Sequence, residues 1–153
     1  MAIIENKKNA AVIRLVFLFT PIFFSLIIIF GLVGGIFHGA VFYIIVSVIF
    51  ITVIYIQWKL KLYYFYYDED GGKLRFRYHS LGPVGKQYKS IEIPKKSFIK
   101  FNIRKSMYGY KKDLILYQKI QGKTAKYPPV SISALNDEDY NILKKHLTKH
   151  AAK

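Results

Sequence analysis

Cations interleaved with aromatic rings form the first set of side chains in this chain whose types and spacing suit binding. They occupy one short segment that contains Lys105, Tyr108, Tyr110, Lys111 and Lys112. Lysine is attracted to the phosphates of anionic lipids, and tyrosine is favoured at the boundary between lipid and water. The pattern therefore fits a loop at a membrane surface and fits an ordinary hairpin with solvated lysines equally well.

A pair of histidines, His146 and His150, forms the second set, four residues apart near the end of the chain. Two imidazoles at this spacing share one face of a helix and can bind a metal ion. The sequence offers no evident third ligand, and the residue after His146 is not the glutamate of metalloprotease helices. We therefore interpret both histidines as cations at a helix end, and we expect no metal and no other cofactor.

Motifs of enzyme chemistry are missing from the sequence. It contains neither a glycine-rich phosphate loop nor a nucleophile elbow, and no pair of carboxylates marks an evident cleft. The absence of cysteine excludes thiolate catalysis and disulfide bonds. These observations predict that the protein is not an enzyme.

A long stretch without charge determines where the remaining residues can lie. Between Arg14 and Lys59 there is no Lys, Arg, Asp or Glu. A helix rises about 1.5 Å per residue and the hydrocarbon layer is about 30 Å thick, so one crossing takes about twenty residues. Backbone polar groups must be paired within lipid, so the spans must be helices. We predict a transmembrane hairpin over residues 15–58, preceded by a polar tail over residues 1–14.

The charges that flank this hairpin predict its orientation. Lys7, Lys8 and Arg14 precede the first span, Lys59 and Lys61 follow the second, and no Lys or Arg lies between the spans. By the positive-inside rule, both termini should be cytoplasmic in a cell inner membrane. The net charge of +15 lies mostly in residues 59–153, which we interpret as one cytoplasmic domain.

Alternation of apolar and polar residues predicts that this domain is mainly β-structure, closed by one helix. Asn136 is a good N-cap for a final helix, in which Leu143 and Leu147 belong to a core-facing stripe. The expected strands cover residues 60–67, 73–78, 88–93, 98–104, 113–118, 126–127 and 130–132.

The order of these elements resembles the bacterial pleckstrin-homology-like (PH-like) membrane proteins. The resemblance is carried by the strand Tyr63–Tyr67, the turn Asp68–Gly72, the strand Lys73–Tyr78 and the segment Val130–Leu135 before the capped helix. It implies an α+β membrane protein with an N-terminal two-helix transmembrane hairpin. A PH-like, partly open β-barrel of about seven strands, closed by a C-terminal α-helix, would follow. It also implies a binding or scaffolding role without enzyme activity.

A loose match to phosphoinositide-binding PH domains follows from this resemblance. Many such domains carry a lysine before the first turn and an Arg-x-Arg motif after it, as Lys61, Arg75 and Arg77 do here. The acidic residues 68–70 between them would repel a phosphate. A solvated cationic strand face therefore explains these residues better than a defined headgroup pocket.

We expect a membrane-anchored adaptor or scaffold on the cytoplasmic face that binds a protein partner or the anionic lipid surface. The surface expected to bind comprises Lys59, Lys61, Arg75, Arg77, Lys100, Arg104, Lys105, Tyr108, Tyr110, Lys111 and Lys112. The alternative is a small accessory subunit of a membrane transport or assembly complex, whose hairpin is the working part. The glycines of the hairpin favour this alternative, namely Gly31, Gly34, Gly35 and Gly39. Nucleic acid binding is disfavoured because no recognised motif for it is present.

Overall fold

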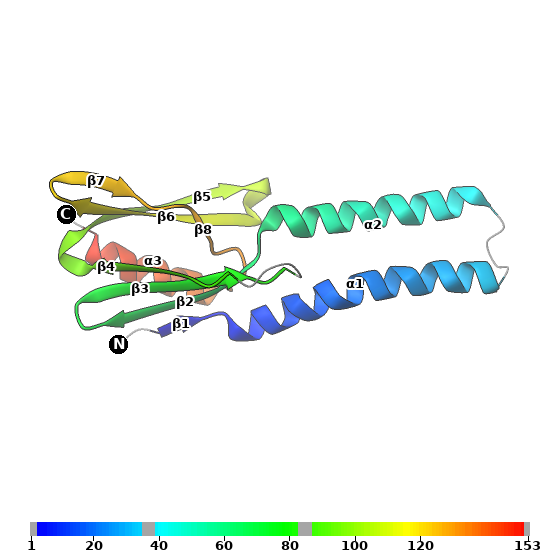
Figure 1. Cartoon of the computed structure of the whole chain (residues 1–153), viewed down its shortest axis with the longest axis horizontal. Helices are drawn as coiled ribbons and strands as arrows, with labels where there is room; N and C mark the ends of the chain where they lie inside the picture. The colour runs from blue at the N-terminus through cyan, green and yellow to red at the C-terminus, as the bar shows by residue number, and fades with distance from the viewer. Residues whose placement is uncertain (1–2, 35–38, 83–86, 152–153) are drawn as a thin grey trace.

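Two long helices extend from one end of a domain built of antiparallel strands and one further helix (Figure 1). The computed structural model describes residues 3–34, 39–82 and 87–151. The helices are α1 (Lys7–Val33) and α2 (Ala40–Leu60). The order of two apolar helices, antiparallel sheets and a C-terminal helix confirms that part of the prediction and fits a membrane-anchored α+β protein.

Both long helices have the length and composition needed to cross a membrane. Only 6% of the most apolar window of each helix is buried, so neither helix is the core helix of a water-soluble domain. Large apolar side chains such as Phe30, Leu32 and Val41 are more than 60% exposed. Uncovered apolar surface costs about 25 cal/mol per Å² in water, and a bilayer would remove that cost.

The two helices touch through a small number of close contacts. A Cβ atom on Gly31 would lie 3.2 Å from the hydroxyl of Tyr43, so a glycine at this position allows the ring to approach. Gln57 donates a hydrogen bond to Thr20, with 3.2 Å between the two atoms. Gly34 and Gly39 are the caps that end α1 and begin α2. Gly35, the second glycine of the predicted packing motif, lies outside the described residues.

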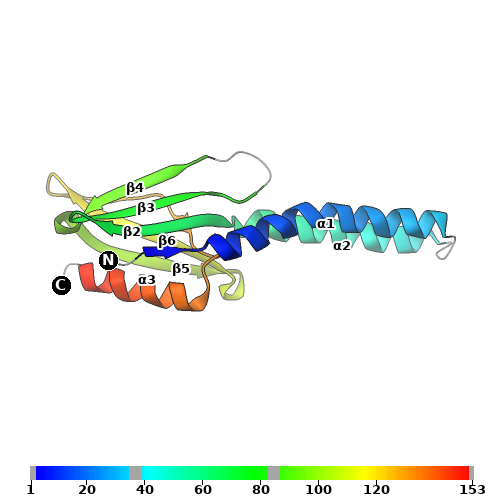
Figure 2. The ribbon, with the colours of Figure 1, turned by 90° about the horizontal axis from the view of Figure 1, so that it is seen from below.

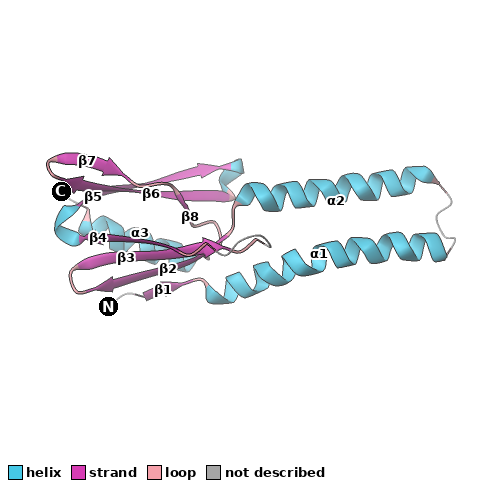
Figure 3. Ribbon diagram, in the orientation of Figure 1, coloured by secondary structure: helices cyan, strands magenta, loops and turns pink. Residues whose placement is uncertain are grey.

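The strands form two separate antiparallel sheets (Figure 3). The first has the order β1-β2-β3-β4, with β1 (Ile3–Glu5), β2 (Tyr63–Asp70), β3 (Lys73–Ser80) and β4 (Lys89–Pro94). In the second, β6 pairs with β5, β7 and β8, with bounds β5 (Phe98–Ser106), β6 (Lys111–Ile120), β7 (Lys123–Lys126) and β8 (Val130–Ser131). Within the described residues no strand pair joins the two sheets, so they are not closed into the barrel that the resemblance implied.

The last helix, α3 (Asp137–His150), contacts the edge strands β1 and β5 and so lies across the open side between the sheets (Figure 2). Its N-cap is as predicted, because the side chain of Asn136 accepts a hydrogen bond of 2.7 Å from the backbone of Asp139. Leu143 and Leu147 are completely buried, which confirms the predicted apolar stripe. The core between the sheets and α3 is formed by Phe65, Tyr67, Leu74, Phe76, Ile93, Leu114, Leu116, Ile132, Leu143 and Leu147.

The start of the chain differs from the predicted polar tail over residues 1–14. Residues 3–5 form β1, which pairs with β2, and α1 already begins at Lys7. Between them, the buried side chain of Asn6 donates to the carbonyl of Tyr63 and accepts from the backbone N–H of Phe65, both at 2.9 Å. The N-terminus is therefore a structural part of the domain.

The predicted turn over residues 68–72 is shorter than expected. Only Gly71 and Gly72 form it, with φ angles of +54° and +85°. Two successive glycines supply the positive φ values that a two-residue hairpin requires, so the acidic residues 68–70 can remain in β2. Because side chains alternate along a strand, Asp68 and Asp70 share one face of β2 and Glu69 lies on the other.

Candidate functional site

A groove of about 480 Å³ lies on the outer face of the first sheet. We call it the proximal groove, because the strand ends that form it lie at the end of the domain beside α1 and α2 (Figure 1). Its main lining residues are Tyr64, Tyr66, Arg77, His79, Tyr88 and Lys89. The pairing of β2 with β3 and of β3 with β4 brings these residues together from three strands.

A ladder of rings forms one wall of the proximal groove. The rings of Tyr64 and His79 are stacked at 4.7 Å, and those of His79 and Tyr88 lie 4.8 Å apart. Arg14 of α1 lies 2.9 Å from His79 Nε2, and the hydroxyl of Tyr64 donates to Glu5 of β1 at 2.7 Å. Burial and the Glu5 carboxylate raise the pKa of Tyr64 to about 12, so its phenol is neutral at physiological pH. Contacts with residues 5 and 14 therefore fix this wall to the N-terminal segment.

The two arginines of the Arg-x-Arg motif have different surroundings. Arg75 forms ion pairs with Asp68 at 3.8 Å, Asp70 at 3.7 Å and Glu92 at 3.1 Å. Arg77, exposed and two residues closer to α2, has no ion pair within the described part of the chain. Three carboxylates thus compensate the charge of Arg75, whereas the charge of Arg77 remains available in the groove.

The turn between β5 and β6 lies at the end of the domain that faces α1 and α2 (Figure 1). It contains a 3₁₀ turn, η2 (Met107–Gly109), in which Tyr108 has a positive φ of 54°. Tyr108 is fully exposed and Tyr110 is 77% exposed. Two exposed rings at the end of the domain that faces the helices suit the interface of a bilayer. We call residues 105–112 the aromatic loop.

The other cations of the expected surface mostly have partners. Lys59 lies over the ring of Trp58 and Lys100 over that of Tyr117. Lys61 is exposed and ends α2 in the left-handed conformation. In and beside the aromatic loop, Arg104 and Lys111 pair with Asp113, Lys112 pairs with Asp137, and Lys105 and Lys112 lie over the ring of Tyr140. The expected surface is therefore divided, and two of its members without an ion pair among the described residues, Lys61 and Arg77, lie toward the helices.

The rings of the proximal groove were missed in the sequence. Tyr64 and His79 occupy outward positions of alternating strands, but their stacking depends on the register between β2 and β3. Tyr88 joins them only through the pairing of β3 with β4. The available signal was the run of tyrosines in residues 63–67, which indicates a ring-lined strand without indicating its neighbours.

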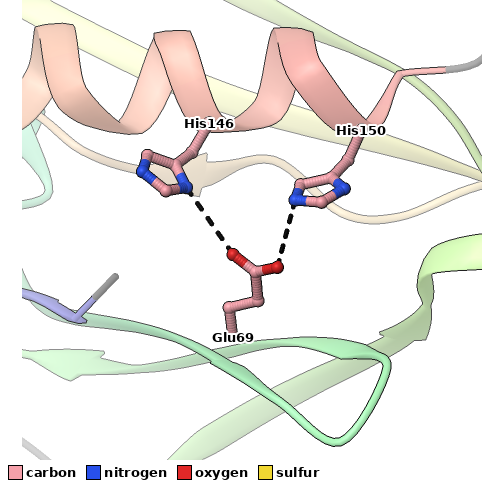
Figure 4. Close-up of side chains that lie close together, drawn as sticks. All are labelled: Glu69, His146 and His150. Carbon is pink, nitrogen blue, oxygen red and sulfur yellow. Dashed lines mark ion pairs between the residues drawn. The ribbon is translucent and has the colours of Figure 1, made fainter. Parts of the chain in front are cut away.

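A second cluster lies at the end of the domain farthest from the hairpin. There Glu69 of β2 faces both His146 and His150 of α3 (Figure 4). The sequence offered no evident third ligand for the histidine pair, and the fold supplies one. Glu69 was not predicted as a ligand because it belongs to an acidic run that we expected to form a turn.

Comparison with known proteins does not identify the chain, because no protein-family model, curated protein or solved structure matches it. Its function is therefore inferred from the proximal groove and the aromatic loop.

Proposed function

We propose that the protein spans the cell inner membrane twice, with both termini and the domain on the cytoplasmic side. The domain, which we consider PH-like, serves as an adaptor that binds anionic lipid headgroups of the same membrane. The proximal groove and the aromatic loop make the contact. We assign no enzyme activity to it.

The uncompensated charge of Arg77 is the observation that carries this proposal. A strand rises about 3.3 Å per residue, so the pair Tyr66–Arg77 lies about 10 Å along β2 from Tyr63, close to where α2 ends. The headgroup layer is about 5–8 Å thick, and electrostatic attraction extends about 8–10 Å beyond it at physiological salt. Arg77 is therefore within reach of lipid phosphates, whereas Arg75 lies farther away and is already paired.

The chemistry of the groove suits a lipid phosphate. A guanidinium can donate two parallel hydrogen bonds to phosphate oxygens, and Lys89, at the start of the edge strand β4, also lines the groove. The rings of Tyr64 and Tyr88 offer an apolar wall to the glycerol part of a headgroup. The acidic residues expected to repel phosphate lie farther from α2 than Arg77, toward the turn of Gly71 and Gly72, and Asp68 and Asp70 pair with Arg75.

Lipid retention by the full chain tests the proposal. Deletion of residues 1–58 would remove β1 and Asn6 from the domain, so the intact protein is required. Native mass spectrometry would compare the retention of phosphatidylglycerol and phosphatidylcholine by protein released from mixed micelles. Arg77→Gln should weaken the preference for phosphatidylglycerol about fivefold, because one cation near the surface contributes about 1 kcal/mol.

Arg75→Gln is the matched control, since it removes the same charge from the same strand face. It should weaken the lipid preference less than Arg77→Gln does, because Arg75 lies two residues farther from α2. An equal preference for both lipids in the unmodified protein, or an Arg77→Gln variant that behaves like it, would contradict the proposal. Crosslinking in intact membranes would then be the way to find a protein partner instead.

The orientation has its own test, because the chain contains no cysteine. Lys119→Cys introduces a single thiol at an exposed position of β6. A maleimide that cannot cross membranes should label this thiol only after the cells are permeabilised. Labelling of intact cells would place the domain outside and refute the orientation.

The accessory-subunit alternative has less support. It was based on the glycines of the hairpin, but Gly31 packs against Tyr43 of the same hairpin, Gly34 caps the end of α1 and Gly39 caps the start of α2. These roles are internal to the hairpin and do not require a second subunit.

A further inference from the structure

Three potential metal ligands from two distant segments meet at the end of the domain opposite the hairpin. His146 and His150 project from neighbouring turns of α3 toward Glu69 on β2 (Figure 4). His146 Nδ1 lies 3.6 Å from one carboxylate oxygen, and His150 Nε2 lies 3.2 Å from the other. All three ligand atoms lie within 4.8 Å of one another.

These distances are close to those of a tetrahedral metal site. Zinc binds imidazole nitrogen and carboxylate oxygen at about 2.0–2.2 Å, so ligands of one zinc ion lie roughly 3.4 Å apart. The two contacts to Glu69, one to each carboxylate oxygen, bracket that value, and rotation of the carboxylate and the imidazoles would bring one oxygen and both nitrogens to a single ion. Two nitrogens and one oxygen form a donor set that suits zinc and its neighbours better than calcium or magnesium.

One further observation points to a ligand at this position. His146 Nδ1 is buried and has no hydrogen-bond partner in the described structure, although it faces the carboxylate. Glu69 also forms an ion pair with Lys95 through one of its carboxylate oxygens. Lys95 contacts the carboxylate oxygen that faces His150. The other oxygen, which faces His146, has no contact with Lys95.

We propose that Glu69, His146 and His150 bind one divalent transition-metal ion, with zinc as the best match. The ion would connect β2 directly to the last turn of α3. Three protein ligands would leave a fourth position for water or another small ligand. Lys95 competes with the ion for the same carboxylate, so binding of the metal weakens the ion pair between Lys95 and Glu69. This site is independent of the proposed lipid contact.

Metal titration of the full chain in detergent micelles tests the proposal, after treatment with a chelator and removal of any polyhistidine tag. Isothermal titration calorimetry with zinc chloride should give one site per chain at micromolar zinc. Cobalt in its place should produce the intense visible absorption of a four-coordinate ion. Zinc should also raise the melting temperature, since it binds the folded chain.

The variants distinguish this cluster from non-specific binding. His146→Ala, His150→Ala and Glu69→Gln should each weaken binding at least tenfold. Asp70→Asn is the matched control for Glu69→Gln, because the neighbouring carboxylate lies on the other face of β2 and pairs with Arg75. Its affinity for zinc should equal that of the unmodified protein. Lys95→Gln should bind zinc about threefold to fivefold more tightly, because it removes a competing ion pair.

The proposal fails if the unmodified chain gives neither binding heat nor cobalt absorption. It also fails if both histidine variants, with circular dichroism spectra like that of the unmodified protein, retain its affinity. Should either histidine variant unfold, Lys95→Gln decides the question with Asp70→Asn as its unchanged control, because an unchanged affinity in Lys95→Gln would overturn the site.

Discussion

At the end of the domain beside α1 and α2, the outer face of β2 and β3 carries stacked rings and Arg77, which has no ion pair among the described residues. Farther along the same face, Arg75 is surrounded by three carboxylates. On the reverse side of that distal end, Glu69 contacts Lys95 and two histidines of α3. One pair of strands thus has an end with available positive charge and an end whose charges are paired.

The difference shows that register, more than composition, sets the charge of a sheet face. Arg75 and Arg77 are two residues apart and point the same way, yet Arg75 lies opposite Asp68 and Glu92, whereas Arg77 lies opposite Tyr66 and Ser90. The two ends are also attached differently. The proximal end is held to α1 by polar contacts, and the distal end is covered by the apolar face of α3.

Removing the apolar contact at the distal end should have the largest effect on stability. Leu147 is completely buried, and Leu147→Ala should lower the free energy of unfolding by about 3–5 kcal/mol through lost burial and the resulting cavity. Denaturant unfolding of the full chain in detergent would measure this loss. The exposed Lys149→Ala should change stability by less than about 0.5 kcal/mol. A similar small change in Leu147→Ala would mean that α3 does not hold the distal end.

Removing a polar contact at the proximal end should have the next largest effect on stability. Asn6→Leu leaves the backbone N–H of Phe65 and the carbonyl of Tyr63 without their side-chain partner. The expected loss is about 2–3 kcal/mol, since each buried group without a partner costs about 1–3 kcal/mol. Hydrogen exchange of β2 amides would locate the effect, with faster exchange expected at Phe65. Unchanged exchange there would show that the N-terminal segment is not needed at this end.

Substitution of the two arginines should have different effects on the stability of the protein as well as on its lipid preference. Arg75→Gln should lower the free energy of unfolding by about 1 kcal/mol, because it breaks a network of partly exposed ion pairs. High salt should reduce this loss. Arg77→Gln should have almost no effect at either salt concentration. Thermal unfolding at low and high salt would show both, and equal losses in the two variants would erase the distinction between the ends.

The smallest expected effect is a change in the pKa of Tyr64, which belongs to the wall of rings in the proximal groove. Tyr64 has a pKa of about 12 in the folded chain, above its ordinary value of 10.0, so the fold favours the neutral phenol. Its contribution to stability is therefore complete below pH 10 and is lost as the pH rises toward 12. Glu5→Gln should lower this pKa, because it removes a negative charge that faces the phenol. Tyrosinate absorbance, with Tyr64→Phe subtracted, would measure the shift, and an unchanged pKa would mean that β1 does not reach the wall.

Features that depend on neighbouring residues were predictable from the sequence. The charge-free stretch indicated both long helices, the residues around Asn136 indicated the capped α3, and alternation in residues 73–78 indicated β3. The β1 strand was not predictable, since three residues carry too little periodicity to distinguish a strand from a tail. The acidic run was assigned to a turn because Asp and Gly favour turns, but Gly71 and Gly72 alone supply the required backbone angles.

The sequence by itself determined that the chain has two helices of membrane length and a basic antiparallel domain, because apolar length and periodicity are local properties of a chain. Only the tertiary structure decided which cations are compensated and which rings and ligands meet. Arg75 and Arg77 differ through partners on other strands, and His146 and His150 gain Glu69 from a distant hairpin. Such partners are chosen by strand register and by the docking of α3, which no short segment of sequence specifies.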